Sequence, residues 1–136
     1  MARHVLVDAG FLVALLSSRD THHPWAVSQA SELPPPWFTC EGVLSEAFHL
    51  LGERGIHSLA ALLGRRALII GFSLAENLEP AIQLIAKYSN VPMGFADACL
   101  VRMTEILANP VVLTTDQDFR VYRRHSRHII PSVIPD

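Results

Sequence analysis

The stretch Val-Leu-Val-Asp-Ala-Gly-Phe-Leu-Val-Ala-Leu-Leu occupies residues 5–16 and sets one acidic residue, Asp8, between two apolar runs. The apolar run from His4 to Val7 predicts a strand, and the pattern from Phe11 to Ser17 predicts a helix. An unpaired carboxylate among apolar neighbours is unfavourable, so Asp8 needs a partner, a metal ion or a proton. Aspartate is also favoured at the N-cap of a helix, which leaves a capping role and a functional role equally open.

The same succession of a short apolar strand and a helix recurs along the chain. Strands are expected at residues 37–40, 67–70 and 111–114, and a weaker strand pattern, interrupted by prolines, covers 128–134. Helices are expected over residues 22–33, 41–54 (with Gly55 as its stop), 57–65, 74–88, 95–108 and 117–124. This alternation predicts an α/β fold in which helices cover both faces of a parallel sheet.

Length and composition narrow the class of protein. The chain has 136 residues, of which 50% are apolar and 18% charged, enough for a single domain over residues 1–136 with a buried core. No apolar run reaches the roughly 20 residues that cross a bilayer, and no signal-peptide pattern is present. Cys40 and Cys99 have neither a zinc-ligand spacing nor the density of a disulfide scaffold. We therefore expect a small soluble domain located in the cytoplasm.

Acidic residues occupy the positions where such a sheet binds ligands, just beyond the carboxyl ends of its strands. Asp8 follows the first strand, and Asp116 follows a later one, with Asp118 two residues on. Asp116 and Asp118 cannot both cap the next helix. Asp97 begins a helix that is apolar around most of its circumference, so its carboxylate is expected to point inward. Glu46 borders an apolar stripe and a polar face, and its pattern alone favours the surface.

Carboxylates at corresponding ends of neighbouring strands would meet in one cleft. Like charges repel there unless a multivalent cation joins them. A ligand set made only of carboxylates favours Mg²⁺ or Mn²⁺, ions that bind substrate phosphates and activate water for phosphodiester hydrolysis. A zinc enzyme is not favoured, because the sequence has no His-Glu-x-x-His motif and the adjacent His22 and His23 would point apart on a helix.

Arginine is concentrated near the end of the chain. The formal net charge is −2, yet of the 11 basic residues only Lys87 is not arginine. The guanidinium group suits phosphate oxygens, so Arg120, Arg123 and Arg124 are candidates for phosphate contact. A solvated basic face on a last helix explains this cluster equally well.

Five segments together resemble PIN-domain nucleases, and most closely the small prokaryotic ribonucleases of the VapC toxin type. They are residues 5–15, Asp-Thr-His-His-Pro-Trp-Ala at 20–26, Leu-Ser-Glu-Ala at 44–47, Pro-Met-Gly-Phe-Ala-Asp-Ala-Cys-Leu-Val at 92–101 and Leu-Thr-Thr-Asp-Gln-Asp-Phe at 113–119. The resemblance covers essentially the whole chain. It implies a three-layer α/β/α sandwich with a mostly parallel sheet, and a Mg²⁺- or Mn²⁺-dependent endoribonuclease. It further implies an RNA substrate, a homodimer and a cognate antitoxin protein that covers the acidic cleft.

The resemblance also assigns roles to single residues. The four acids of the family fall on Asp8, Glu46, Asp97 and Asp116, of which the three aspartates bind metal and Glu46 binds metal or positions the attacking water. Asp118 matches a neighbour that is often acidic and is a further candidate metal ligand.

Two further positions near these acids are places where a side-chain hydroxyl can support the site. Thr115 lies where a polar residue can support the site. The family often has Ser or Thr where this chain has Gly10. A hydroxyl that helps to orient the metal ligands is therefore expected to be missing, with lower activity or an altered metal preference as the consequence.

Other acidic-site enzymes do not fit the sequence. An aspartyl-nucleophile phosphatase needs an aspartate where Gly10 stands. A phosphoacceptor receiver domain needs a lysine near a late strand, whereas Lys87 lies within a predicted helix. No Gly-x-x-x-x-Gly-Lys phosphate-binding loop is present. Two alternatives remain open, a non-catalytic PIN-fold module that binds RNA or protein and a PIN nuclease that performs housekeeping RNA processing.

Overall fold

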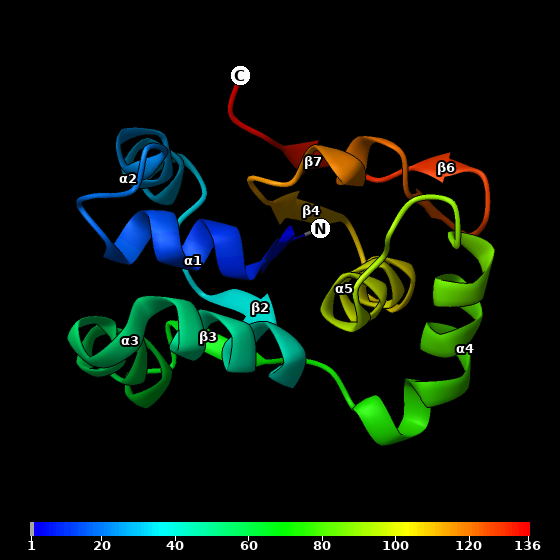
Figure 1. Ribbon diagram of the computed structural model, residues 1–136, viewed down its shortest axis with the longest axis horizontal. Coiled ribbons are helices and arrows are strands. Elements are labelled where there is room, and N and C mark those ends of the chain that lie inside the picture. Colours follow the sequence, from blue (N-terminus) through cyan, green and yellow to red (C-terminus); the bar gives the residue numbers. More distant parts are fainter. Residues whose placement is uncertain (1) are drawn as a thin grey trace.

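A parallel sheet of five strands runs through the centre of the computed structural model, which describes residues 2–136 (Figure 1). The strands are β1 (His4–Val7), β2 (Trp37–Thr39), β3 (Leu68–Ile70), β4 (Pro110–Leu113) and β7 (Ser132–Val133). They lie in the order β3-β2-β1-β4-β7, and every neighbouring pair is parallel. The predicted parallel sheet is confirmed, and the proline-interrupted pattern near the end of the chain supplies its edge strand.

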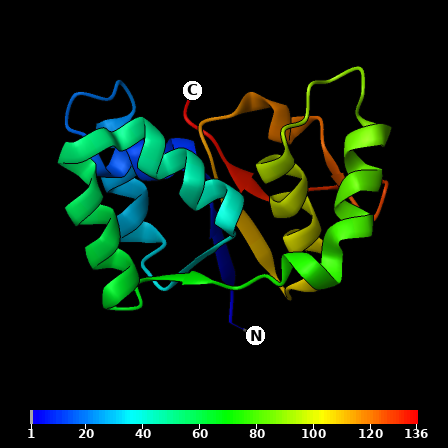
Figure 2. The same ribbon diagram turned by 60° about the horizontal axis from the view of Figure 1, so that its bottom comes forward.

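Five helices connect the strands and cover the sheet. They are α1 (Ala9–Leu16), α2 (His23–Glu32), α3 (Glu41–Gly64), α4 (Leu74–Lys87) and α5 (Phe95–Ile106). Crossovers between parallel strands are right-handed. A crossover that leads to the next strand on one side of the sheet therefore places its helix on the opposite face from a crossover that leads to the other side. Figures 1 and 2 accordingly show α1, α2 and α3 gathered on one side and α4 and α5 on the other. The α/β/α sandwich is confirmed.

The two central strands form the core of the molecule. Leu6, Val7, Val112 and Leu113 have no exposed surface, as expected for strands that helices cover on both faces. The rigid ends of β1 and β4 are therefore available to hold side chains in fixed positions. None of the helices in residues 2–136 has the length and apolar character needed to span a membrane.

Helix α3 differs from the two separate helices expected at residues 41–54 and 57–65. The bend between its two segments lies at Gly52, whose φ of 63° and ψ of −160° are not helical. The predicted stop at Gly55 is wrong, because Gly55 is buried within the second segment. A Cβ atom at Gly55 would lie 2.4 Å from Cβ of Leu51, so the missing side chain makes room for Leu51.

The helix expected at residues 117–124 is also corrected. Only the single turn η1 (Gln117–Arg120) forms, and it is followed by β5 (Arg123–Arg124), which pairs antiparallel with β6 (His128–Ile129). A tertiary contact accounts for the difference, because the backbone N–H of Arg123 donates a 2.8 Å hydrogen bond to the hydroxyl of Tyr88, the C-cap residue of α4. The chain therefore leaves the helical path after one turn.

The bend at Gly52 gives a direct test of this description of α3. The φ and ψ of Gly52 lie in a region open almost only to glycine, so Gly52→Ala is expected to lower the free energy of unfolding by about 1–3 kcal/mol. Gly64→Ala is the matched control, because a Cβ atom added at either glycine would meet open space but only Gly52 has a positive φ. Gly64→Ala should leave stability unchanged or slightly higher. Equal urea midpoints for the two variants would contradict the bend.

Candidate active site

A cavity of about 330 Å³ opens where the carboxyl ends of β1 and β4 meet the first turns of α3 and α5. Its lining includes the four predicted acids Asp8, Glu46, Asp97 and Asp116. These residues are distant in the sequence and come from four different segments. The fold therefore brings together the carboxylates that the sequence analysis singled out.

Asp8 is both a helix cap and part of the cavity wall. It is 7% exposed and directly follows β1. Its Oδ1 accepts a 2.9 Å hydrogen bond from the N–H of Phe11 at the start of α1, and its Oδ2 accepts a hydrogen bond from the hydroxyl of Thr114. The capping and functional interpretations of Asp8 are therefore compatible, since the cap fixes a carboxylate that also lines the cavity.

Thr114 links the two strand-end aspartates and was missed by the sequence analysis. Its fully buried hydroxyl donates to Asp8 and accepts a 2.9 Å hydrogen bond from the N–H of Asp116. Asp116 in turn caps η1, because its Oδ1 accepts a 2.8 Å hydrogen bond from the N–H of Asp118. A threonine that ends a buried strand two residues before an aspartate was the available signal in the sequence.

The remaining acids differ in how they approach the cavity. Asp97 lies in the first turn of α5 and is half-buried, which agrees with its predicted inward direction. Glu46 is exposed on α3, as its pattern alone suggested, and still lines the cavity. Asp118 is half-buried within η1 and is not among the residues that line the cavity.

Burial and repulsion raise the pKa of two of these carboxyl groups, Asp8 and Asp97. Burial raises the pKa of Asp8 to about 7, the charges of Asp97 and Asp116 add to the rise, and the hydrogen bonds from Thr114 and Phe11 oppose it. Burial also raises the pKa of Asp97 to about 6, with added repulsion from the neighbouring carboxylates. Ionising the whole group at neutral pH is therefore unfavourable without a cation.

The residues fit a hard divalent cation in their chemistry and their location. The charged side chains that line the cavity are all carboxylates, the donors that Mg²⁺ and Mn²⁺ prefer. In the described part of the chain, no three Asp, Glu, His or Cys side chains are already drawn together as a ligand set. A bound cation would relieve the repulsion between these like charges.

The side chain of Thr115 fills the space next to Gly10, beside Asp8. A Cβ atom on Gly10 would lie 2.1 Å from Oγ1 of Thr115, so the Thr115 hydroxyl occupies the place that a side chain at position 10 would take. Both residues line the cavity. The hydroxyl that was expected to be missing at position 10 thus has a counterpart that reaches the same place from the loop after β4.

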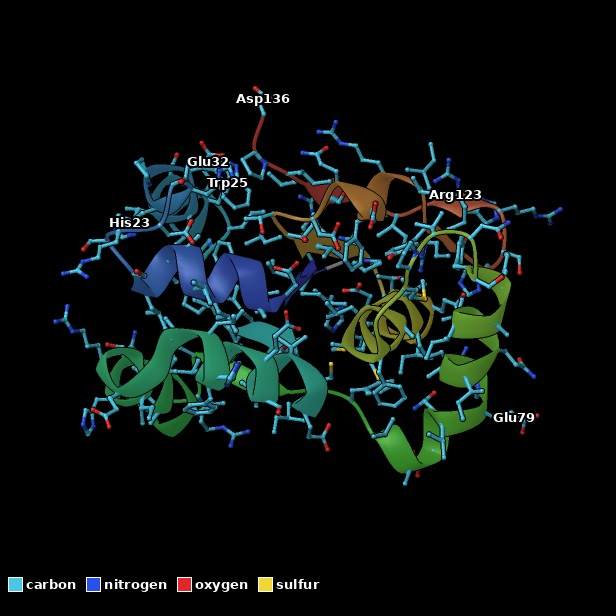
Figure 3. The ribbon with its side chains drawn as sticks, viewed as in Figure 1. His23, Trp25, Glu32, Glu79, Arg123 and Asp136 are labelled. Carbon is cyan, nitrogen blue, oxygen red and sulfur yellow. The ribbon has the colours of Figure 1, made fainter. Side chains whose placement is uncertain are left out.

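The candidate phosphate-binding arginines are partly occupied by contacts within the protein. Arg124 donates to the carbonyl of Thr104 through Nε (3.0 Å) and Nη2, and Arg123 donates to three carbonyls, including that of Arg120 at 2.7 Å. Figure 3 shows Arg123 beside the β5–β6 hairpin, on the opposite side of the molecule from His23 of α2. Arg120 is exposed. Phosphate contact by these residues stays a prediction.

Comparisons with known proteins agree with this geometry. The family model of the PIN domain matches residues 5–124. The chain belongs to the PIN domain family. The PIN fold is also that of the crystal structure of Mycobacterium tuberculosis VapC20, described as a toxin that cleaves the sarcin-ricin loop, with a TM-score of 0.73. The two are 24% identical, and the match covers 86% of this chain and 93% of VapC20. A search of curated proteins found no match.

The raised pKa of Asp97 predicts how stability changes with pH. The folded, metal-free protein holds this proton more tightly than the unfolded chain does, so the carboxyl group of Asp97 destabilises the fold as pH rises from about 4 to above 6. In EDTA, Asp97→Asn should therefore melt at a higher temperature than the wild type at pH 8 and at nearly the same temperature at pH 4. The exposed Glu53→Gln is the control and should show no such trend. A melting temperature for Asp97→Asn below that of the wild type at pH 8 would contradict the described repulsion.

The shared space of Gly10 and Thr115 predicts a rescue. Gly10→Ser should lower the melting temperature and the affinity for Mn²⁺, because the new side chain collides with the Thr115 hydroxyl. Adding Thr115→Ala removes the collision, so the double variant should recover most of both losses. Thermal melts with and without Mn²⁺ measure the two effects. A double variant no better than Gly10→Ser alone would show that the two positions are not coupled.

Proposed function

We propose that this PIN domain, a single domain over residues 1–136, is a Mg²⁺- or Mn²⁺-dependent endoribonuclease of the VapC toxin type. One observation carries the proposal: four carboxylates from separate segments line a single cavity at the carboxyl ends of β1 and β4. Carboxylates that converge in this way favour a divalent cation far more than a solvated acidic surface does. The PIN family match supports the same chemistry.

Each residue has a stated role in this proposal. Asp8, Asp97 and Asp116 hold the metal, and Glu46 binds metal or orients the attacking water. Asp118 and Thr115 support them from the loop after β4. The bound cation would supply a water of lowered pKa and would neutralise charge that develops on the phosphate oxygens.

The protein holds the proposed metal ligands in position. Thr114 fixes the carboxylate of Asp8 against the backbone of Asp116, so two ligands on neighbouring strands keep a constant separation. The cap of α1 holds the other oxygen of Asp8. Hydrogen bonds hold these carboxylates in place, so they lose little conformational freedom when the cation binds. Their oxygens also cannot rotate toward solvent.

The substrate and partners follow from the family and the structural neighbour. VapC20 is described as cleaving an RNA loop, which supports RNA as the substrate class here. We further propose a cytoplasmic homodimer and a cognate antitoxin protein that covers the acidic cavity. Contacts of Arg120, Arg123 or Arg124 with RNA phosphates complete the proposal.

Metal removal and one substitution test the function. EDTA should abolish cleavage of total RNA, and added Mg²⁺ or Mn²⁺ should restore it. Asp97→Asn should remain folded and lose at least about 100-fold in kcat/KM, because one negative ligand is gone. The control is Glu79→Gln, an exposed acid on α4 far from the cavity (Figure 3), and it should cleave as the wild type does.

Two outcomes would count against the proposal. Wild-type cleavage by a folded Asp97→Asn protein would exclude the proposed ligand role. An RNA-binding protein that cuts no RNA with either metal would instead favour the non-catalytic binding module.

A further inference from the structure

A second groove continues from the acidic cavity and carries the opposite charge. It has a volume of about 300 Å³ and runs between the end of α1 and the bend of α3. The charged residues in its lining are Arg19 and Arg54, and the remainder is apolar or carries serine hydroxyls. Leu50 lines both hollows, so the acidic cavity and the basic groove are neighbours along one surface.

We propose that this groove holds the RNA backbone beside the phosphate that is cleaved, with Arg19 and Arg54 contacting its phosphates. The inference rests on the proposed ribonuclease function and adds a substrate subsite to it. The acids attract an RNA strand only at the phosphate that shares the metal, and they repel every other phosphate. A strand that enters the cavity therefore needs cationic groups next to it.

The bend of α3 contributes to the shape and charge of the groove. The first helical segment ends before Gly52, and the second begins beside Arg54 and Gly55, both of which line the groove. The arginine fork matches phosphate oxygens with two parallel hydrogen bonds.

Leu50 supplies an apolar surface at the junction of the two hollows. Leu50 is 55% exposed. A nucleotide that crosses from the cavity to the groove passes over this side chain and can rest its base there. Backbone phosphates on the arginines and a base on an apolar side chain position a strand without reading its sequence.

RNA suits the groove better than an acidic protein segment does. Both are anionic, but the groove joins a cavity whose carboxylates and implied cation act on phosphodiesters. Two of the arginines predicted from the sequence to contact phosphate, Arg123 and Arg124, donate to backbone carbonyls through their guanidinium groups. Arg19 and Arg54 are exposed and lie beside the acids instead.

The test measures binding of a single-stranded RNA to the Asp97→Asn protein, which cannot cleave it, by fluorescence anisotropy at several salt concentrations. Arg19→Gln with Arg54→Gln should weaken binding at least 10-fold. It should also lower the slope of log Kd against log salt by about 1.4, at roughly 0.7 for each phosphate contact. In the cleaving protein the same pair should raise KM far more than it lowers kcat.

The control pair is Arg3→Gln with Arg65→Gln, two exposed arginines at the amino ends of β1 and β3, on the opposite edge of the sheet. It should leave Kd, slope and KM unchanged. If the Arg19 and Arg54 variants behave like this control while the wild type still cleaves RNA with Mg²⁺, the groove proposal is wrong and the proposed function stands. A polyglutamate peptide serves as a model of an acidic protein segment. If the Arg19 and Arg54 variants lose binding to this peptide but bind RNA as the wild type does, the groove binds a protein segment and the proposal is wrong. Absence of any metal-dependent cleavage by the wild type would contradict the ribonuclease function itself.

Discussion

Repulsion among carboxylates that the fold forces together is the constraint on which the rest of this structure depends. The parallel pairing of β1 with β4 puts Asp8 and Asp116 at one edge of the sheet, and α5 adds Asp97. Burial raises the pKa of Asp8 to about 7 and that of Asp97 to about 6, and repulsion from the neighbouring carboxylates adds to both rises. Such a cluster lowers stability in the metal-free state, and the proposed divalent cation would offset that loss.

The structure also shows that two carboxylates can cap helical turns and still line the cavity. Asp8 caps α1 and Asp116 caps η1 through one oxygen each, and the buried Thr114 hydroxyl joins the two. The first turns of α1 and η1 and the Thr114 hydroxyl, just after β4, therefore hold the acids in place. The site is fixed by the same hydrogen bonds that begin the elements around it, so its geometry is expected to be lost only when those elements unfold.

Sequence patterns predicted the sheet, the sandwich and the three aspartates because strand ends and helix starts are local signals. Glu46 needed the family resemblance, since an exposed acid on a helix looks the same whether or not a cavity lies beside it. Thr114 has the pattern of an ordinary strand residue, and its role depends on a partner 106 positions away. Gly55 makes room for Leu51 within a helix instead of ending one, and η1 ends early where the N–H of Arg123 donates to the Tyr88 hydroxyl. Periodicity does not encode either contact.

The acidic cavity and the basic groove are neighbours on one surface, and the proposed cleavage of RNA there depends on a bound cation. Anomalous diffraction from a crystal soaked in Mn²⁺ locates the ion directly. The account predicts a peak in the cavity with carboxylate oxygens of Asp8, Asp97 and Asp116 at about 2.0–2.2 Å. A fully occupied Mn²⁺ peak elsewhere, with none between these three residues, would contradict it.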